Sequence, residues 1–218
     1  MPPTNAHLNA IFAADHALRE HEKALLSGDP DELRKQLSDA VSEAQNLTDR
    51  QDAIVRLERL ADLCSQVHGP QMVDALIAIL DDEAPSVRVQ AAEALVDVGF
   101  ERYAEVARGI ERALAAPNVA GSALQELPWV LVEIAEPSAR PLIARFLKHE
   151  DVDVVASAVE ALAELGDPEA VKDLMPLRND PRPVELDDDE PDSVATLGEL
   201  VTETLEELGE ELEGSAAR

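Results

Sequence analysis

The sequence ALVDVG at residues 94–99 returns in altered form at four other places in the chain. The other copies are RLADLC at 59–64, VLVEIA at 130–135, ALAELG at 161–166 and TLEELG at 204–209. Every copy has an acid in its fourth position and an aliphatic residue in its fifth. Successive copies begin between 31 residues (130 to 161) and 43 residues (161 to 204) apart. A period of this length is typical of solenoids built from stacked supersecondary units.

Each copy is expected to end a helix, because Gly99, Gly166 and Gly209 stand where a left-handed C-terminal cap favours glycine. Between copies there is room for one further helix and two turns, so the expected unit is a helical hairpin. The predicted hairpins pair residues 30–46 with 48–67, 70–81 with 86–98, 101–116 with 122–135, 138–148 with 152–165, and 168–176 with 192–212.

A further amphipathic helix is predicted over residues 5–26, with Leu8, Ile11, Phe12, Leu18 and Leu25 at helical spacing. It is expected to cap the exposed apolar end of the stack. The predicted fold class is therefore all-α, an α-solenoid of about five hairpins with no sheet. The predicted organisation is a capping helix at 1–28, a solenoid at 29–213 (hairpins at about 30–67, 70–98, 101–135, 138–165 and 168–212), and a tail at 214–218.

The composition limits the classes of function. Aromatic residues make up only 2% of the chain, so the core must consist of Leu, Ile, Val and Ala. Cys64 is the only cysteine, which excludes an internal disulfide and is typical of a reducing compartment. It aligns with the glycine caps and is interpreted as a small buried filler. The longest uninterrupted apolar run is Ala75–Leu80, too short to span a membrane. We expect a cytoplasmic protein.

The charge is strongly acidic. Eighteen Lys and Arg stand against 46 Asp and Glu, which gives a net charge of −28. Such a field repels phosphate, so neither nucleic acid nor an anionic membrane is an expected partner. Two explanations stay open, and both can hold. The acids recruit a basic partner, or they adapt the surface to a very salty cytoplasm, since acid excess with little Lys resembles the proteins of salt-loving archaea.

Residues 70–99 (PQMVDALIAILDDEAPSVRVQAAEALVDVG) resemble a short HEAT repeat of the kind described in phycobilin lyases. They have an apolar first helix, an acidic turn, and Val87-Arg88 opening the second helix. Residues 138–166 are less similar, with Val155 where Arg88 stands. The resemblance implies the fold more than the function, because HEAT-like proteins include lyases, glycosylases, hydroxylases and scaffolds. Short HEAT proteins of salt-loving archaea include adaptors of taxis signalling and of the motility motor.

The enzymes of this family supply the alternative function, a bilin lyase or a di-iron hydroxylase. The hydroxylase uses four His-Glu pairs. This chain has two such dipeptides, His21-Glu22 and His149-Glu150, at predicted helix ends. No two histidines lie at the i, i+4 spacing of a metal pair, and no glycine-rich phosphate loop is present. We therefore expect no enzymatic activity, no cofactor and no metal.

The repeat register predicts an acidic binding face. The residue before each copy and the fourth residue within it are four positions apart, so they share one helix face. Second helices of such hairpins are expected to line the concave side of a solenoid. The predicted partner-binding residues are Glu58, Glu93, Trp129, Glu160 and Glu203, followed one turn later by Asp62, Asp97, Glu133, Glu164 and Glu207.

Two details favour a binding site over a merely solvated surface. The acids at Asp97, Glu133, Glu164 and Glu207 are expected in last helical turns, where the helix dipole disfavours an anion by about 0.3–1 kcal/mol. Trp129 interrupts the acids, and an exposed Trp beside carboxylates suits an amphipathic basic segment. Alternatively, Trp129 is partly buried and fills space beside Pro128.

A second acidic candidate lies in the last hairpin. Residues 178–193 (RNDPRPVELDDDEPDS) are predicted to form a mobile loop, with the run Asp187, Asp188, Asp189 and Glu190 as a docking element or a solvating edge. The predicted function is a non-catalytic adaptor or scaffold that binds a basic or amphipathic protein on its acidic concave face, with signalling or motility assemblies as candidates by resemblance.

Overall fold

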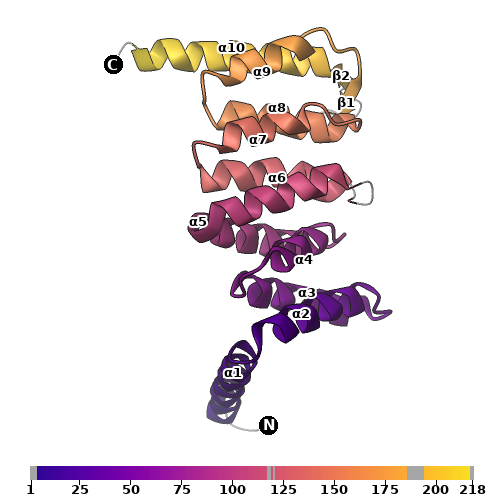
Figure 1. Ribbon diagram of the computed structural model, residues 1–218, viewed down its shortest axis with the longest axis vertical. Helices are drawn as coiled ribbons and strands as arrows, with labels where there is room; N and C mark the ends of the chain where they lie inside the picture. Colours follow the sequence, from indigo (N-terminus) through magenta and orange to yellow (C-terminus); the bar gives the residue numbers. More distant parts are fainter. Residues whose placement is uncertain (1–3, 117–118, 120, 186–193, 217–218) are drawn as a thin grey trace.

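The computed structural model describes residues 4–116, 119, 121–185 and 194–216. Its helices stack as successive antiparallel pairs, from α2 and α3 near the N-terminus to α9 and α10 near the C-terminus (Figure 1). The prediction of an all-α solenoid is confirmed. The elements are α1 Thr4–Leu26, α2 Pro30–Gln45, α3 Arg50–Ser65, α4 Pro70–Leu80, α5 Pro85–Ala115, α6 Gly121–Ile134, α7 Ala139–Phe146, α8 Val152–Glu164, α9 Ala170–Leu174, the 3-10 helix η1 Met175–Leu177, β1 Pro183–Glu185, β2 Val194–Thr196 and α10 Leu197–Ala216.

The core runs through all the layers and is aliphatic, as the composition requires. Its largest fully buried side chains include Leu57, Leu76, Leu95 and Leu131, together with the single aromatic Phe146. Burying a side chain of this size contributes about 1.5–3 kcal/mol, so aliphatic burial within and between the helix pairs is the main source of stability.

Arginine side chains connect one layer to the next. Arg50 at the start of α3 pairs with Asp82, which precedes α5. Arg112 in α5 lies 2.6 Å from Asp74 of α4. In the same way Arg145 of α7 lies 2.6 Å from Glu111 of α5. These contacts join residues about one repeat apart in sequence, so they stabilise the relative position of the layers.

The element α5 contains both of the helices predicted over 86–98 and 101–116. They meet at a kink at Arg102, where φ is −140° and ψ is 46°, so the first of them runs past Gly99. Gly99 therefore lies inside a helix, and the predicted left-handed cap at this residue is wrong. Its role is close packing, since a Cβ here would lie 2.7 Å from Cγ1 of the buried Ile134 and closer still to Cδ1.

Among the other copies, the last residue either ends its helix in a left-handed cap or lies inside the helix. Gly166 has φ 63°, which confirms the predicted cap after α8. Ala135 takes the same left-handed conformation, with φ 53°, at the alanine of the copy that ends α6. The cap predicted at Gly209 is wrong, because α10 continues to Ala216. Every copy nevertheless lies largely on the second helix of its pair, as the repeat predicts.

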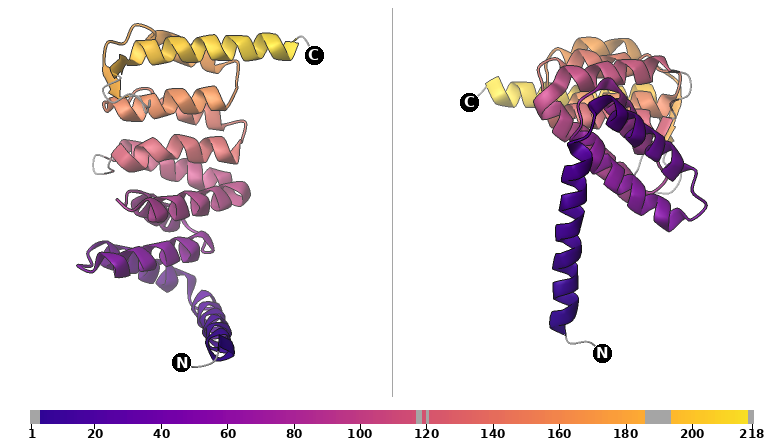
Figure 2. Two further views of the ribbon diagram at one scale, coloured as in Figure 1. Left: turned by 180° about the vertical axis from the view of Figure 1, so that it is seen from behind. Right: turned by 60° about the horizontal axis from the view of Figure 1, so that its bottom comes forward.

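Helix α1 forms where it was predicted but does not cover the end of the stack. It projects away from the other helices (Figure 2, right), and Leu8, Ile11, Phe12 and Leu18 are all exposed. Only its C-terminal end packs against the core, through Leu25 and neighbouring residues. The prediction of a capping role is therefore wrong for this structure.

A short β-hairpin contradicts the prediction of no sheet. Strands β1 and β2 pair antiparallel, with Val184 opposite Ala195. Helix α9 and η1 together are short, and β1 packs against α8 beside them. Val184 of β1 is buried in this contact. The hairpin lies between α9 and α10, outside the repeat copies, so it leaves their register intact. It also replaces part of the loop predicted at 178–193.

No helix in the described ranges has both the length and the apolar character needed to cross a membrane.

Candidate functional site

The predicted partner-binding residues share one face of the stack, formed by α3, the first half of α5, α6, α8 and α10. We call it the second-helix face; Figure 2 (left) shows these helices from behind. Most of the predicted residues are exposed there, while two at the N-terminal end are half-buried. The exposed ones are Glu93, Asp97, Trp129, Glu133, Glu160, Glu164, Glu203 and Glu207, and the half-buried ones are Glu58 and Asp62.

A groove between α5 and α6 brings four of these residues together. It has a volume of about 660 Å³ and is lined by Glu93, Asp97, Trp129 and Glu133 among others. Farther along the face, Glu164 and Glu207 line a smaller hollow of about 180 Å³ between α8 and α10. The remaining predicted residues lie outside these two sites.

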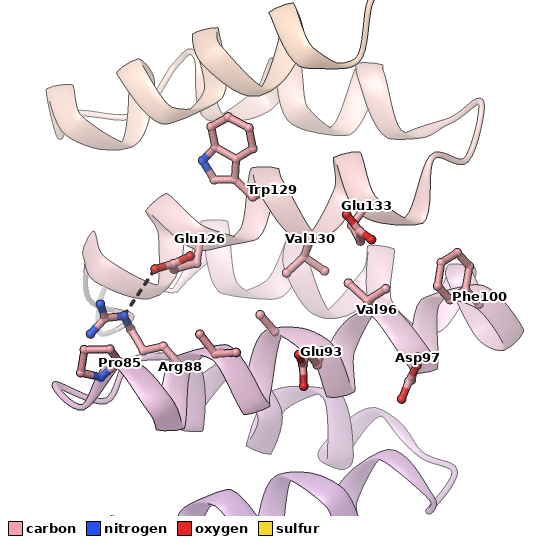
Figure 3. A pocket seen from close by; sticks show the side chains of 12 residues that line it. Pro85, Arg88, Glu93, Val96, Asp97, Phe100, Glu126, Trp129, Val130 and Glu133 are labelled. Atoms are coloured by element: carbon pink, nitrogen blue, oxygen red, sulfur yellow. Dashed lines mark hydrogen bonds and ion pairs between the residues drawn. The ribbon is translucent and has the colours of Figure 1, made fainter. Parts of the chain in front are cut away.

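The two ends of the α5–α6 groove differ in chemistry (Figure 3). Arg88 and Glu126 form an ion pair of 3.4 Å at one end, and Phe100 lies at the other. Arg88 also donates to the backbone carbonyl of Glu83 at 3.1 Å, so its guanidinium is held in place. The indole of Trp129 extends from α6 on the side away from α5 and forms the rim of the groove.

Three carboxylates along the groove, those of Glu93, Asp97 and Glu133, have no ion pair within the part of the chain that the structure describes. The sole cation that lines the groove is Arg88, and Glu126 already neutralises it. The groove therefore presents an uncompensated negative potential to a ligand.

Large apolar side chains lie beside these carboxylates. Val89, Phe100 and Trp129 are 57%, 62% and 39% exposed, and all three line the groove. Trp129 lies beside buried Pro128, and its side chain is partly buried and partly accessible to a ligand, so both interpretations offered for it stay open. An apolar surface next to unpaired carboxylates can bind a segment that carries both apolar and cationic side chains.

Sequence reasoning missed Val89, Phe100 and the Arg88–Glu126 pair as parts of this site. Phe100 was expected in a turn after Gly99. Because α5 continues past that glycine, Glu93, Asp97 and Phe100 follow one another at helical spacing and share a face. Val89 precedes Glu93 by one turn, and this i, i+4 spacing was the signal that could have identified it.

The acidic column is not uniform along the stack. Asp62 lies 3.0 Å from Arg59 and accepts a hydrogen bond of 2.8 Å from Gln90, so the N-terminal end is largely compensated. Glu160 also has an interaction within the chain. The expectation that four acids occupy last helical turns holds for Glu133 and Glu164 only, because α5 and α10 continue beyond Asp97 and Glu207.

Cations are absent from a large part of the second-helix face. Helices α6, α8 and α10 contain no Lys or Arg, whereas their partners α7 and α9 contain Arg140, Arg145 and Lys172. The negative charge is therefore segregated onto one side of the last three layers.

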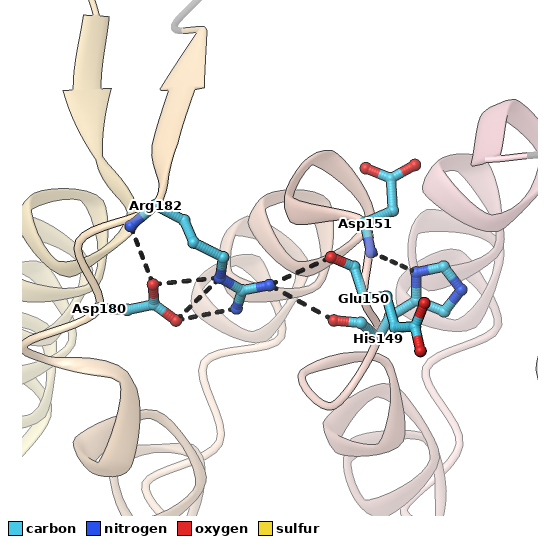
Figure 4. A network of polar contacts seen from close by, with 5 residues as sticks. All are labelled: His149, Glu150, Asp151, Asp180 and Arg182. Carbon is cyan, nitrogen blue, oxygen red and sulfur yellow. Dashed lines mark hydrogen bonds and ion pairs between the residues drawn. The ribbon is translucent and has the colours of Figure 1, made fainter.

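The two His-Glu dipeptides have structural partners. In Figure 4, the carbonyls of His149 and Glu150 accept hydrogen bonds from Arg182 at 3.5 and 3.4 Å, which ties the β-hairpin to the preceding layer. The side-chain hydrogen bond from Arg182 lowers the pKa of Asp180, against a weaker opposite effect of burial. Glu22 of the other dipeptide pairs with Arg59. Within the described ranges, no three His, Cys, Asp or Glu side chains are grouped to hold a metal ion.

Two other predicted features have simple outcomes. Cys64 is fully buried, as expected for a filler residue, and burial raises the pKa of its thiol to about 12. The acidic run Asp187, Asp188, Asp189 and Glu190 lies outside the described residues.

Comparisons with known proteins give one family match and several structural likenesses. A designed armadillo repeat protein in complex with the peptide (KR)4 is 16% identical, with 95% of each chain covered and a TM-score of 0.35. Two engineered proteins of a structural genomics consortium are 17% and 18% identical, with TM-scores of 0.36 and 0.35. The matches cover 89% and 86% of this chain, and 97% and 53% of theirs. Likenesses at these TM-scores carry no argument about function. No curated protein matches the chain. The family described as HEAT repeats matches residues 109–188. This segment includes the copy at 138–166 but not residues 70–99, so the resemblance to HEAT repeats is confirmed at 138–166. Its phycobilin-lyase kind stays a prediction.

Proposed function

We propose that this chain is a non-catalytic interaction scaffold whose α5–α6 groove binds a protein segment with apolar side chains flanked by Lys or Arg. The observation that carries the proposal is the lining of this one groove, where three unpaired carboxylates adjoin three exposed large hydrophobic side chains. A match to HEAT repeats is consistent with a scaffold, because stacked repeats present extended surfaces to other proteins.

Each part of the groove has a distinct role in this proposal. Val89, Phe100 and the rim residue Trp129 bind the apolar side chains of the partner, and their removal from water provides most of the affinity. Glu93, Asp97 and Glu133 attract Lys or Arg, which speeds association and fixes orientation. A cation near the indole face of Trp129 gains a further cation–π attraction.

The position of Trp129 supplies a direct assay, because it is the only tryptophan of the chain. The probe is a synthetic amphipathic helical peptide of Leu and Lys, and the control peptide has Glu in place of every Lys. Binding of the Leu-Lys peptide is expected to bury the half-exposed indole and shift its emission to shorter wavelength, saturably. Emission that stays unchanged with the Leu-Lys peptide, or shifts equally with the control peptide, would contradict the proposal.

Variants test whether the groove is the binding surface. Trp129→Ala is expected to weaken binding of the labelled peptide, measured by anisotropy, by more than about 1 kcal/mol. Glu93→Lys and Glu133→Lys are expected to slow association and reduce its salt dependence. The matched control is Glu43→Lys on α2, which is exposed and changes the net charge equally. If all three reversals behave alike and Trp129→Ala has no effect, the acids are only a solvated surface.

The natural partner can then be sought by affinity capture at molar KCl. A basic or amphipathic protein that is retained by the wild type and lost by Trp129→Ala is the expected result.

A further inference from the structure

Helix α1 has an apolar face that nothing in the described chain covers. Leu8, Ile11, Phe12 and Leu18 are each between 45% and 65% exposed. The helix leaves the stack at its C-terminal end, where Glu22 pairs with Arg59 of α3, and projects into solvent (Figure 2, right). These four residues account for nearly half of the exposed large hydrophobic side chains that the structure describes.

A helix in this position needs a packing partner. Helices in proteins obtain most of their stability from tertiary burial of an apolar face, and isolated ones are marginal in water. Ile11 and Phe12 follow Leu8 at spacings of three and four, and Leu18 follows Ile11 at a spacing of seven. The four side chains therefore form one stripe along the helix. Covering that stripe would stabilise α1 and remove the stripe from water.

The charge distribution indicates which partner fits. Helix α1 has three acids (Asp15, Glu20, Glu22) and two bases (Arg19, Lys23), which give it a net charge of −1. The residues outside α1 therefore carry −27 of the total net charge of −28. Its first three turns, up to Asp15, carry no charged side chain. A basic partner is attracted to the acidic face rather than here. A second copy of this chain is repelled by that face, and α1 is the element on which it can approach without strong repulsion.

We propose that two copies of this chain associate through α1, with the two helices packed antiparallel along the stripe. In the antiparallel arrangement Leu8 of one copy lies near Leu18 of the other, and Phe12 lies at the centre. The two acidic stacks are then at opposite ends of a helix about 34 Å long. This separation exceeds the Debye length of about 8 Å at physiological salt. A parallel pair would place both stacks side by side and each Asp15 against its copy.

Analytical ultracentrifugation of the full chain in molar KCl tests the association. The wild type is expected to sediment with twice the 23.5 kDa mass of one chain. Phe12→Asp is expected to sediment as a monomer. Val55→Asp is the matched control, because Val55 is also an exposed apolar residue on a helix, and it should remain a dimer. A monomeric wild type overturns the proposal, and so does a dimer that survives Phe12→Asp.

Disulfide cross-linking tests the direction of packing. Because Cys64 is fully buried, a cysteine introduced in α1 is the only accessible thiol. A mixture of Leu8→Cys and Leu18→Cys chains, oxidised with diamide, is expected to give a mixed covalent dimer, while each variant alone gives far less. Efficient cross-linking of each variant with itself would show parallel packing and overturn the antiparallel arrangement.

Discussion

Replacing Gly99, Gly166 or Gly209 with alanine is expected to change the stability of the fold for a different reason at each residue. The three glycines nevertheless hold the same position of the repeat. Gly99 and Gly209 lie inside helices α5 and α10. Gly166 has φ 63° and ends α8 in the left-handed conformation. The backbone conformation and the free space around each glycine therefore determine the sign of each effect.

The magnitudes follow from these surroundings. At Gly209 a Cβ would meet nothing within 4 Å, so alanine gains up to about 1 kcal/mol of helix propensity. At Gly166 space is also free, but a left-handed alanine costs about 1–2 kcal/mol. Alanine also lowers the conformational entropy of the unfolded chain, which offsets about 0.4–1 kcal/mol of that cost. At Gly99 the same helix gain is opposed by overpacking against Ile134, which costs about 1–3 kcal/mol.

The assay is thermal unfolding in molar KCl, followed by circular dichroism. For a chain of this size a change of 1 kcal/mol shifts Tm by about 2–4 °C. Tm is expected to rise for Gly209→Ala and to fall for Gly99→Ala and Gly166→Ala. In an Ile134→Ala background, Gly99→Ala should become stabilising because its methyl group fills the vacated space, whereas Gly166→Ala should still destabilise. A higher Tm for Gly99→Ala in the wild-type background would refute the packing role of this glycine.

Three further outcomes are expected. The Tm of the wild type should rise with KCl from physiological to molar concentration, because screening reduces the self-repulsion of a chain at −28; a flat response would contradict salt adaptation. Burial would raise the pKa of Asp82, but hydrogen bonds from Arg50 and the Ala84 amide hold that pKa below its usual value. Asp82→Asn should therefore lower the urea midpoint at pH 7. The difference should begin to shrink as the pH falls to about 4 and disappear only as the pH passes through the lowered pKa of the folded state. Finally, Glu133→Lys combined with Lys172→Glu keeps the net charge at −28 and should weaken peptide binding as much as Glu133→Lys alone; equal binding to the wild type would show that only total charge matters.

The repeat pattern predicted the helical pairs well but not the role of each glycine. Glycine suits both a left-handed cap and a close helix contact, because both require the absence of a Cβ. The copies that end in Gly99 and Gly166 are nearly the same, but Pro168 follows Gly166 and favours a helix end there. At Gly99 the distinguishing feature is the close contact with Ile134. Such a contact comes from the next layer of the stack, so it cannot be inferred from a single copy.

The candidate site was predicted in part for a related reason. Register alone placed Glu93, Trp129 and Glu133 on one face, since that depends only on helical periodicity. The apolar part of the groove depends on the continuation of α5 through Gly99, which brings Phe100 into line with Asp97. The β-hairpin was missed because its strands are three residues long and form through pairing and the burial of Val184, not through a local pattern.

The placement of the acids bears on the two proposed explanations of the net charge. Adaptation to salt concerns the whole surface and does not require acids and bases to lie on different faces. Helix α7 carries Arg140 and Arg145 without an acid, and α9 carries both Lys172 and Asp173. Helices α6, α8 and α10 carry acids without any Lys or Arg. This segregation raises the repulsion within the second-helix face, and Glu133 and Glu164 also oppose the dipoles of their helices. A partner that brings Lys or Arg relieves both effects, so the unfavourable energy of the free chain becomes a favourable contribution to the complex.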